Sequence, residues 1–412
     1  MQHNFSKTIL ASLILSSLTG VVYAEKNNEK SAVNTETAKL ETIVVSASGF
    51  EQNIKKAAAT ISVLSQEDIN KKAYRDVTDA LKDVPGVVVT GGGSSSDISI
   101  RGMGSAYTVI MIDGKKVNTR SVRPNSDNSG IEQGWLPGIE SIERIEVIRG
   151  PMSGLYGSDA MGGVINIITK KSATEWSGAV KVDTTLQENS DSGNIHQTNA
   201  YVSGPLIKDL LSLKANATYS KREEDNIIGG YKEQKMRAGG ATLTLTPNDK
   251  HAIDFDFKRS IQNRNGTVGK TIENKPGRGG ALPTDSLTDY YRTEYSISHR
   301  GEVGAVKTNS YIQREETENP SRQMEAINTT FNTNNQFQLG SHDISFGGMY
   351  LKEELEDKGN RLGDNGTKLS SLDRYSWALF AEDNWRIAYP FVLTTSLRLD
   401  KDEKFGDHLS PK

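Results

Sequence analysis

The chain has 412 residues, a formal net charge of −3 and no cysteine. The acidic balance argues against non-specific nucleic-acid binding, which needs a basic surface, and the lack of cysteine excludes a disulfide framework. The mean hydropathy is −0.54, and no apolar run reaches the roughly 18 residues of a membrane-spanning helix. Transmembrane β-barrels have a similar average, because their strands alternate lipid-facing and lumen-facing residues.

The first residues have the three parts of a secretory signal. Lys7 supplies a positive start, residues 9–18 are apolar, and Val22-Tyr23-Ala24 ends the segment with small residues at the two positions that a signal peptidase reads. We therefore predict a signal peptide over residues 1–24. The alternative is a short buried helix.

A polar leader follows at residues 25–49. Its first part, residues 25–39, cannot bury a core and is expected to be flexible. It is followed by a β-branched pulse, Glu41, Thr42, Ile43, Val44 and Val45. From the residues alone, this pulse is either a docking strand that adds to the sheet edge of another protein or the first strand of the next domain.

Residues 50–171 are predicted to form a compact α+β domain. Ser65 is placed to cap a helix that follows the strand 61–64, and Asp113-Gly114 is a tight-turn signal between strands 107–112 and 115–117. The other predicted elements are a helix over 76–81, stopped by Pro85-Gly86, and strands at 87–89, 98–100, 142–148 and 164–169.

After Trp176 the pattern changes to long alternating strands, several of which match the roughly 9–11 residues needed to cross a bilayer at a tilt. About eleven are predicted, at 177–186, 196–203, 211–221, 239–246, 251–258, 290–300, 306–315, 327–339, 342–351, 374–388 and 391–400.

The connections between these strands alternate between short and long. Residues 247–250 and 301–305 are short connections, whereas 259–289, 316–326 and 352–373 are long. Short turns on one side and long loops on the other are typical of an outer-membrane barrel, which we predict over residues 172–412. The alternative is a large soluble β-domain. The candidate interfacial aromatic residues are Trp176, Tyr201, Tyr219, Tyr295, Tyr311, Trp377 and Trp385.

The predicted strand count is odd, whereas bacterial single-chain barrels have an even number of strands. An unclosed sheet in lipid would leave an edge of backbone groups without partners. We therefore expect this chain to be a fragment that lacks the second half of the barrel.

Several stretches resemble TonB-dependent outer-membrane receptors. The plug end of that family is matched by ERIEVIRGP at 143–151 and by LYGSDAMGGVINIITK at 155–170, and its earlier part by 98–104 and 112–114. Residues 41–45 match the TonB box. Residues 76–137, with 125–127 and 132–137, most resemble the colicin I receptor group of catecholate siderophore receptors.

The resemblance implies an α+β plug inside an antiparallel barrel of about 22 strands, of which about the first 11 are present here. It implies uptake of ferric catecholate siderophores at the outer membrane of a Gram-negative bacterium, with TonB, ExbB and ExbD supplying energy through Glu41 to Val45. Colicins, phages and lipopolysaccharide are further implied ligands. Ferric iron would be carried as the siderophore complex, and no covalent cofactor, metal site or nucleic-acid partner is expected.

In this arrangement the plug arginines Arg101, Arg144 and Arg149 are expected to pair with barrel carboxylates and to fix geometry. Glycines are expected to allow tight turns and close strand approach, at Gly102, Gly104, Gly150, Gly157, Gly162 and Gly163.

A ferric tris-catecholate is anionic and carries flat aromatic rings, so its site should offer cations and aromatic side chains. Two segments qualify. The plug loop 118–137 carries Arg120, Arg123 and Trp135, and the predicted external loop after Lys258 carries Arg259, Arg264, Lys270, Lys275 and Arg278. The alternative for this second group is a solvated loop that pairs with lipopolysaccharide phosphates.

Two other functions stay open from the sequence. One is TonB-dependent uptake of another cargo, such as haem or cobalamin. The other is a passive surface receptor or adhesin, which would have no use for a TonB box. An enzyme is not expected, because no catalytic triad, nucleotide motif or metal-ligand spacing stands out and the six histidines are scattered.

Overall fold

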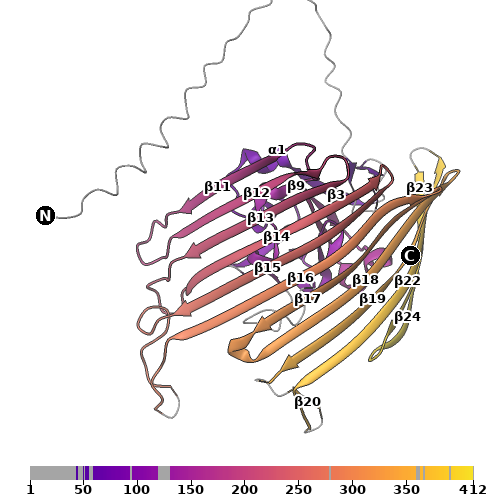
Figure 1. Cartoon of the computed structure of the whole chain (residues 1–412). Coiled ribbons are helices and arrows are strands. Elements are labelled where there is room, and N and C mark those ends of the chain that lie inside the picture. The colour runs from indigo at the N-terminus through magenta and orange to yellow at the C-terminus, as the bar shows by residue number, and fades with distance from the viewer. Residues whose placement is uncertain are drawn as a thin grey trace, which may run out of the picture. The chain divides into compact units, whose positions relative to one another are not determined.

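The computed structural model describes residues 43–44, 50, 52–54, 59–92, 95–118, 130–277, 280–358, 362–364, 367–388 and 391–411. The predicted signal peptide lies outside this part. Residues Thr42–Lys412 form one compact unit. In it, a smaller α+β region lies against one face of a large antiparallel sheet (Figure 1). Among the described residues, no helix is long and apolar enough to cross a membrane.

The smaller region, which we call the plug, contains two sheets. The five-stranded sheet has the order β3-β9-β10-β6-β7, with β10 parallel to β6, and a three-stranded sheet has the order β4-β5-β8. The bounds are β3 (Thr60–Ser65), α1 (Gln66–Lys71), α2 (Val77–Leu81), β4 (Val87–Gly92), β5 (Ser95–Ile100), β6 (Thr108–Ile112), β7 (Lys115–Lys116), β8 (Ile131–Glu132), β9 (Ile142–Arg149), α3 (Ser153–Tyr156) and β10 (Gly163–Thr169). Short 3-10 turns include η3 (Gln133–Trp135) and η4 (Ile139–Ser141).

Local sequence signals explain the plug elements, and the predicted strands and helices are confirmed. Ser65 caps α1 in a capping box with Asp68, whose backbone N–H donates to the Ser65 hydroxyl at 3.2 Å. Asp113 and Gly114 adopt φ values of 51° and 77°, as a tight hairpin turn requires. The core is built from branched apolar side chains of β9 and β10, such as Ile145 and Ile165, which are fully buried.

The close approach of β9 and β10 requires a glycine at position 163. Its φ is +153°, and a Cβ on it would lie 2.2 Å from the carbonyl oxygen of Ile148 on the neighbouring strand. We expect Gly163→Ala to lower the free energy of unfolding by about 1–3 kcal/mol, because the added carbon forces β9 and β10 apart. Gly104→Ala is the matched control, since Gly104 has a φ of −63° and nothing within 4 Å of its Cβ position. Denaturant titration in detergent micelles measures the free energy of unfolding of both variants. Equal values would contradict a steric requirement for glycine at position 163.

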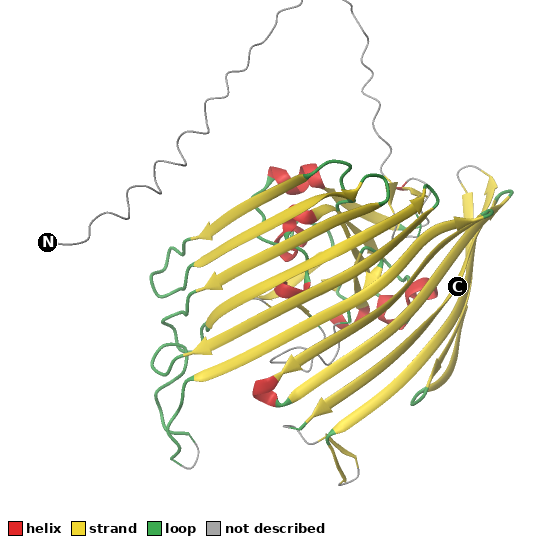
Figure 2. Ribbon diagram, viewed as in Figure 1, coloured by secondary structure: helices red, strands yellow, loops and turns green. Residues whose placement is uncertain are grey.

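The large sheet has twelve strands in chain order from β11 to β24, all antiparallel to their neighbours (Figure 2). Its strands are β11 (Ser177–Thr185), β12 (Ile195–Ile207), β13 (Leu211–Arg222), β14 (Glu233–Asn248), β15 (His251–Gly266), β16 (Ser286–Val303), β17 (Val306–Asn319), β18 (Met324–Leu339), β19 (His342–Asp357), β22 (Ser371–Ala388), β23 (Phe391–Asp402) and β24 (Gly406–Pro411). Between β19 and β22, β20 (Leu362–Asp364) and β21 (Thr367–Leu369) form a separate hairpin.

The sheet corrects two sequence predictions. The predicted count of about eleven strands missed β24, a short strand that pairs with β23 from Leu397 to Asp402. Except for β11, the predicted strands are also longer than expected, because backbone pairing continues beyond the apolar band into polar residues. The predicted loop 259–289 shrinks to residues 267–285, and the predicted loop 316–326 shrinks to residues 320–323.

Strand alternation separates a face against the plug from an outward face. On β15, Asp254 and Asp256 are buried, whereas Phe255 and Phe257 are 44% exposed. The same alternation corrects two of the aromatic predictions. Trp176, Tyr219, Tyr295 and Trp385 are exposed, but Tyr201 and Tyr311 are buried, and Tyr311 lies close to Lys116 of the plug.

Two residues of the predicted docking strand are described, and they form β1 (Ile43–Val44). This strand pairs antiparallel with β2 (Gln52–Asn53), with Ile43 opposite Asn53. Together they make a two-stranded sheet apart from the plug sheets. Glu41, Thr42 and Val45 lie outside the described residues.

Candidate functional site between plug and barrel wall

The plug meets β16 and β17 through a buried cluster around Arg292. The Arg292 guanidinium pairs with the Glu315 carboxylate, and the side chains are 3% and 0% exposed. Glu315 also accepts hydrogen bonds from the side-chain amide and backbone N–H of Asn118 in the plug. Arg292 donates to the Asn118 carbonyl oxygen at 3.3 Å, and lies 4.4 Å above the Trp135 ring. One arginine therefore joins two plug segments to the wall.

A second set of charges lies along the inward face of β15. Lys115 from the plug pairs with Asp256 at 2.5 Å, and both side chains are nearly inaccessible. Thr242 and Ser296 also donate to Asp256, at 2.7 and 2.9 Å. Farther along the strand, Arg264 pairs with Glu132 of the plug at 2.5 Å. Because each charge has an opposite partner, these residues fix the position of the plug against the wall.

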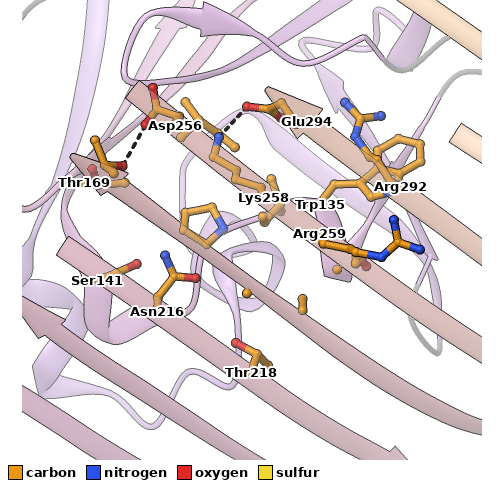
Figure 3. Close-up of a pocket in the computed structure, with 18 of the residues that line it drawn as sticks. Trp135, Ser141, Thr169, Asn216, Thr218, Asp256, Lys258, Arg259, Arg292 and Glu294 are labelled. Atoms are coloured by element: carbon orange, nitrogen blue, oxygen red, sulfur yellow. Dashed lines mark hydrogen bonds and ion pairs between the residues drawn. The ribbon is translucent and has the colours of Figure 1, made fainter. Parts of the chain in front are cut away.

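A small cavity of about 60 Å³ lies between these contacts (Figure 3). Trp135 and Pro137 border it from the plug, and Lys258, Arg292 and Glu294 border it from the wall. Lys258 pairs with Glu294 at 2.7 Å. The Trp135 indole N–H, which has no acceptor among the described residues, is buried next to this space. A cavity of this size has room for water rather than for a ligand with several rings.

Gly134 lies directly on the barrel wall. A Cβ on Gly134 would be 2.3 Å from the Ser260 hydroxyl and 3.1 Å from the Met236 sulfur. The plug segment between Glu132 and Trp135 therefore lies directly against β14 and β15.

Two family models match the chain. The TonB-dependent Receptor Plug Domain matches residues 53–164, and the TonB dependent receptor-like beta-barrel matches residues 176–412. The chain belongs to the TonB-dependent receptor family.

Relatives of this TonB-dependent receptor support the assignment. The "Iron-regulated outer membrane virulence protein" of Vibrio cholerae is 47% identical over 373 residues, which are 90% of this chain and 56% of that protein. The "Ferrienterobactin receptor" of Escherichia coli is 29% identical over 474 residues, covering 98% of this chain and 62% of that one. A crystal structure of a ferric enterobactin receptor variant from Pseudomonas aeruginosa matches with a TM-score of 0.75 and 25% identity, covering 90% and 60% of the two chains. The receptor chain thus spans little more than half the length of these curated relatives.

The receptor structure brings together few of the predicted ligand residues. Trp135 is buried under Arg292, and Arg264 is held by Glu132 on a strand rather than in a loop. Arg259 is also a strand residue, on the outward face, where it donates to Thr293 at 2.7 Å. Lys270 and Lys275 do lie in the loop 267–285, and Lys275 pairs with Glu273. Arg120, Arg123 and Arg278 lie outside the described residues.

The sequence predicts that Arg101, Arg144 and Arg149 pair with barrel carboxylates, but the contacts described for Arg144 and Arg149 lie within the plug. Arg144 pairs with Glu143 and Glu146, both in the plug. Arg149 donates to the Pro85 carbonyl oxygen and to the Ser62 hydroxyl, also in the plug. Arg101 is exposed, with a φ of 52° next to Gly102. Arg149 therefore joins β9 to the segments that carry Ser62 and Pro85, whereas both partners of Arg144 lie on its own strand.

The remaining predicted plug glycines occupy turns or close approaches. Gly102, Gly150 and Gly157 have positive φ values, and a Cβ on Gly162 would meet Met103 at 2.8 Å. Gly104 is the exception, because it has ordinary backbone and open space.

Sequence reasoning missed the residues that join the plug to the wall, namely Lys115, Asn118, Asp256, Arg292 and Glu315. It also missed the wall pair Lys258 and Glu294 beside the cavity. A signal for the wall residues was present, because ionisable residues at every second position of a barrel strand mark its inward face. Among the described residues, no group of three or more histidine, aspartate or glutamate side chains is suited to hold a metal ion.

Asp113 links the plug turn to β13 of the receptor. It accepts hydrogen bonds from the Thr169 backbone N–H and hydroxyl at 2.8 and 2.7 Å, and lies 3.7 Å from Lys214. Burial by itself raises the pKa of Asp113, but Lys214, Lys115 and these hydrogen bonds hold the pKa below its usual value. A depressed pKa contributes stability that is present above the unfolded pKa of about 3.9 and is lost as the pH falls through the folded pKa.

We therefore expect Asp113→Asn to destabilise the receptor at neutral pH. Asn tolerates the left-handed backbone of the turn, so the substitution mainly removes the charge. The deficit relative to wild type should shrink below about pH 4, where the wild-type carboxylate also begins to lose its advantage. Unfolding titrations at about pH 7, 5 and 3 measure this trend. A deficit that does not change with pH would exclude the charge as its cause.

Proposed function

We propose that this chain is part of an outer-membrane receptor that binds and imports ferric catecholate siderophores. Its family membership supports a TonB-dependent receptor, and the names of its relatives favour iron and enterobactin-type cargo. Because the chain covers 56% of the Vibrio cholerae relative, the activity belongs to the whole receptor.

The observation that carries this proposal is the fixed plug. Ion pairs such as Arg292 with Glu315 and Arg264 with Glu132 hold it against the inward face of a sheet with an apolar outward face. A cargo with several rings cannot pass the small cavity, so passage needs the plug to move. The outer membrane has no ATP and no sustained potential, so we infer that the energy comes from the inner membrane through TonB, ExbB and ExbD.

The proposed coupling segment is Glu41 to Val45. It precedes the plug and includes a short extended stretch, Ile43–Val44. Backbone hydrogen bonds to an added strand give affinity without requiring a deep pocket. Pulling on such a strand would transmit force to the start of the plug.

Ligand capture is proposed at Arg120 and Arg123 of the plug loop, together with Lys270, Lys275 and Arg278 of the loop 267–285. Trp135 of the same plug loop is buried under Arg292 and would reach the ligand only after the plug moves. Cations steer an anionic complex inward, and arginine can stack on catechol rings. Arg259 and Arg264 do not belong to this surface, because one faces outward and the other is held by Glu132. Colicins and phages would use the same external loops.

The test is iron-limited growth of a receptor-deficient host that carries the full-length locus. We expect growth on ferric catecholates that is lost when TonB is deleted, and no growth on ferric hydroxamates. Haem is supplied as the iron source in a parallel assay, and cobalamin, which carries no iron, is supplied to a cobalamin-requiring host in iron-replete medium. TonB-dependent growth on haem or cobalamin, without growth on ferric catecholates, would identify a different cargo. Surface binding without TonB-dependent growth would indicate a passive receptor.

A further inference from the structure

Two histidines of neighbouring strands meet on the outward face of the sheet. His251 begins β15, and His299 lies near the end of β16; the register places His251 opposite Gly301 and His299 opposite Ile253. The two histidines are therefore diagonal neighbours. They share their face with the exposed Phe257 and Ile297, away from the plug.

The ring nitrogens of this pair converge. His251 Nδ1 and His299 Nε2 are 3.1 Å apart, and the rings are inclined by only 16°. Both nitrogens face the space beside the Gly301 Cα, since a Cβ there would lie 2.4 Å from His251 Nδ1 and 2.8 Å from His299 Nε2. The absence of a side chain at Gly301 allows both rings to approach its Cα this closely.

We propose that His251 and His299 form a cross-strand site for a divalent first-row transition ion, Ni²⁺ or Cu²⁺. With metal–nitrogen bonds of about 2.1 Å, a nitrogen separation of 3.1 Å corresponds to an angle of about 95° at the metal. This angle fits two adjacent positions of a square-planar or octahedral ion, geometries that Cu²⁺ and Ni²⁺ adopt with imidazole ligands. Water fills the other positions.

The surroundings permit such an ion. Both imidazoles are half-buried, so each ring can rotate to aim its lone pair at a shared ion. The nearby Arg300 points to the other face, where its guanidinium pairs with Asp254 at 3.0 Å. Its positive charge is thus already compensated. The site does not depend on the proposed transport activity.

The competing explanation is a plain hydrogen bond between one protonated and one unprotonated ring nitrogen. This explanation accounts for the distance but predicts no metal affinity. It also predicts that a methyl group at position 301 would disturb only the contact between the two rings and would change no metal binding. The two explanations therefore differ in what the purified protein binds.

The experiment uses the full chain, purified in detergent without a polyhistidine tag and titrated with NiCl₂ by calorimetry and with CuCl₂ by electron paramagnetic resonance. Wild type should bind one ion with two nitrogen ligands. Even outer-shell changes weaken metal affinity by roughly 10-fold to 100-fold, so His251→Gln and His299→Gln should each weaken Ni²⁺ binding by about 100-fold or more. The double variant should be no weaker than either single variant.

Two further variants test whether the ion binds between these two histidines. Gly301→Ala retains both imidazoles, but its Cβ would collide with both rings and displace their nitrogens, so it should also lower the affinity. His342→Gln is the control, because His342 lies near the same end of the sheet but pairs with Asp383 at 2.7 Å and stacks on Trp385. It should bind like wild type. No saturable binding by wild type, or binding that survives both His251→Gln and His299→Gln, would overturn the proposal.

Discussion

Replacing Arg292 by methionine should lower the free energy of unfolding by about 3–5 kcal/mol, the range observed when one partner of a buried ion pair is removed. The substitution leaves the Glu315 carboxylate buried without its cation and removes the stacking partner of Trp135. It also removes the donor to the Asn118 carbonyl oxygen. Guanidinium unfolding in detergent micelles, followed by the fluorescence of Trp135 after the other tryptophans are changed to phenylalanine, measures the loss.

Two comparisons define what the Arg292 result means. The double variant Arg292→Met/Glu315→Gln should be more stable than the sum of the single losses predicts, because no unpaired charge remains. The exposed pair Arg314 with Glu316, whose side chains are 46% and 30% exposed, is the matched control. Arg314→Gln should cost about 0–1 kcal/mol. A loss below about 1 kcal/mol for Arg292→Met would show that this cluster does not hold the plug.

Ile43→Pro should abolish uptake of the siderophore while leaving its binding at the cell surface intact. Proline lacks the backbone N–H that an added strand would need, whereas the proposed ligand loops lie elsewhere in the chain. The measurement combines surface binding of radiolabelled ferric catecholate with its accumulation in energised cells that carry the full-length locus.

The pairing of β1 with β2 provides the control for this variant. Ile43 faces Asn53 in that ladder, so Ile43→Pro also removes a contact within the chain. Asn53→Pro disturbs the same pairing but leaves Glu41 to Val45 unchanged, and it should retain uptake. Normal uptake by Ile43→Pro would exclude the docking-strand mechanism. Equal loss in both variants would assign the effect to the β1–β2 pair.

The candidate site was harder to predict from sequence than the strands. Alternation along β15 and β16 indicates that Asp256, Lys258 and Arg292 share a face, but not which side chains of the plug lie opposite. Lys115 and Asp256 are far apart in the chain, and only the seating of the plug brings them to 2.5 Å. The proposed ligand arginines Arg120 and Arg123 stay predictions.

Errors at the strand ends have a common physical cause. Residues 259–266 are largely polar, which predicts a loop, yet residues 259–265 pair with both β14 and β16. Once two strands are in register, backbone hydrogen bonding continues past the apolar band, because extending a ladder satisfies further N–H and C=O groups. Polarity marks where the apolar band ends rather than where the strand ends.

The sequence by itself determined the local elements of this receptor. Capping at Ser65, the Asp113-Gly114 turn and the apolar strands of the plug depend on neighbours a few residues away, and so does the alternation of the long strands. Only the tertiary structure decided which polar residues meet. Tyr311 comes to lie beside Lys116 of the plug, and Arg292 contacts Glu315, Asn118 and Trp135 from three separate segments. A period of two assigns a residue to a face, whereas its partner depends on contacts between residues distant in the chain.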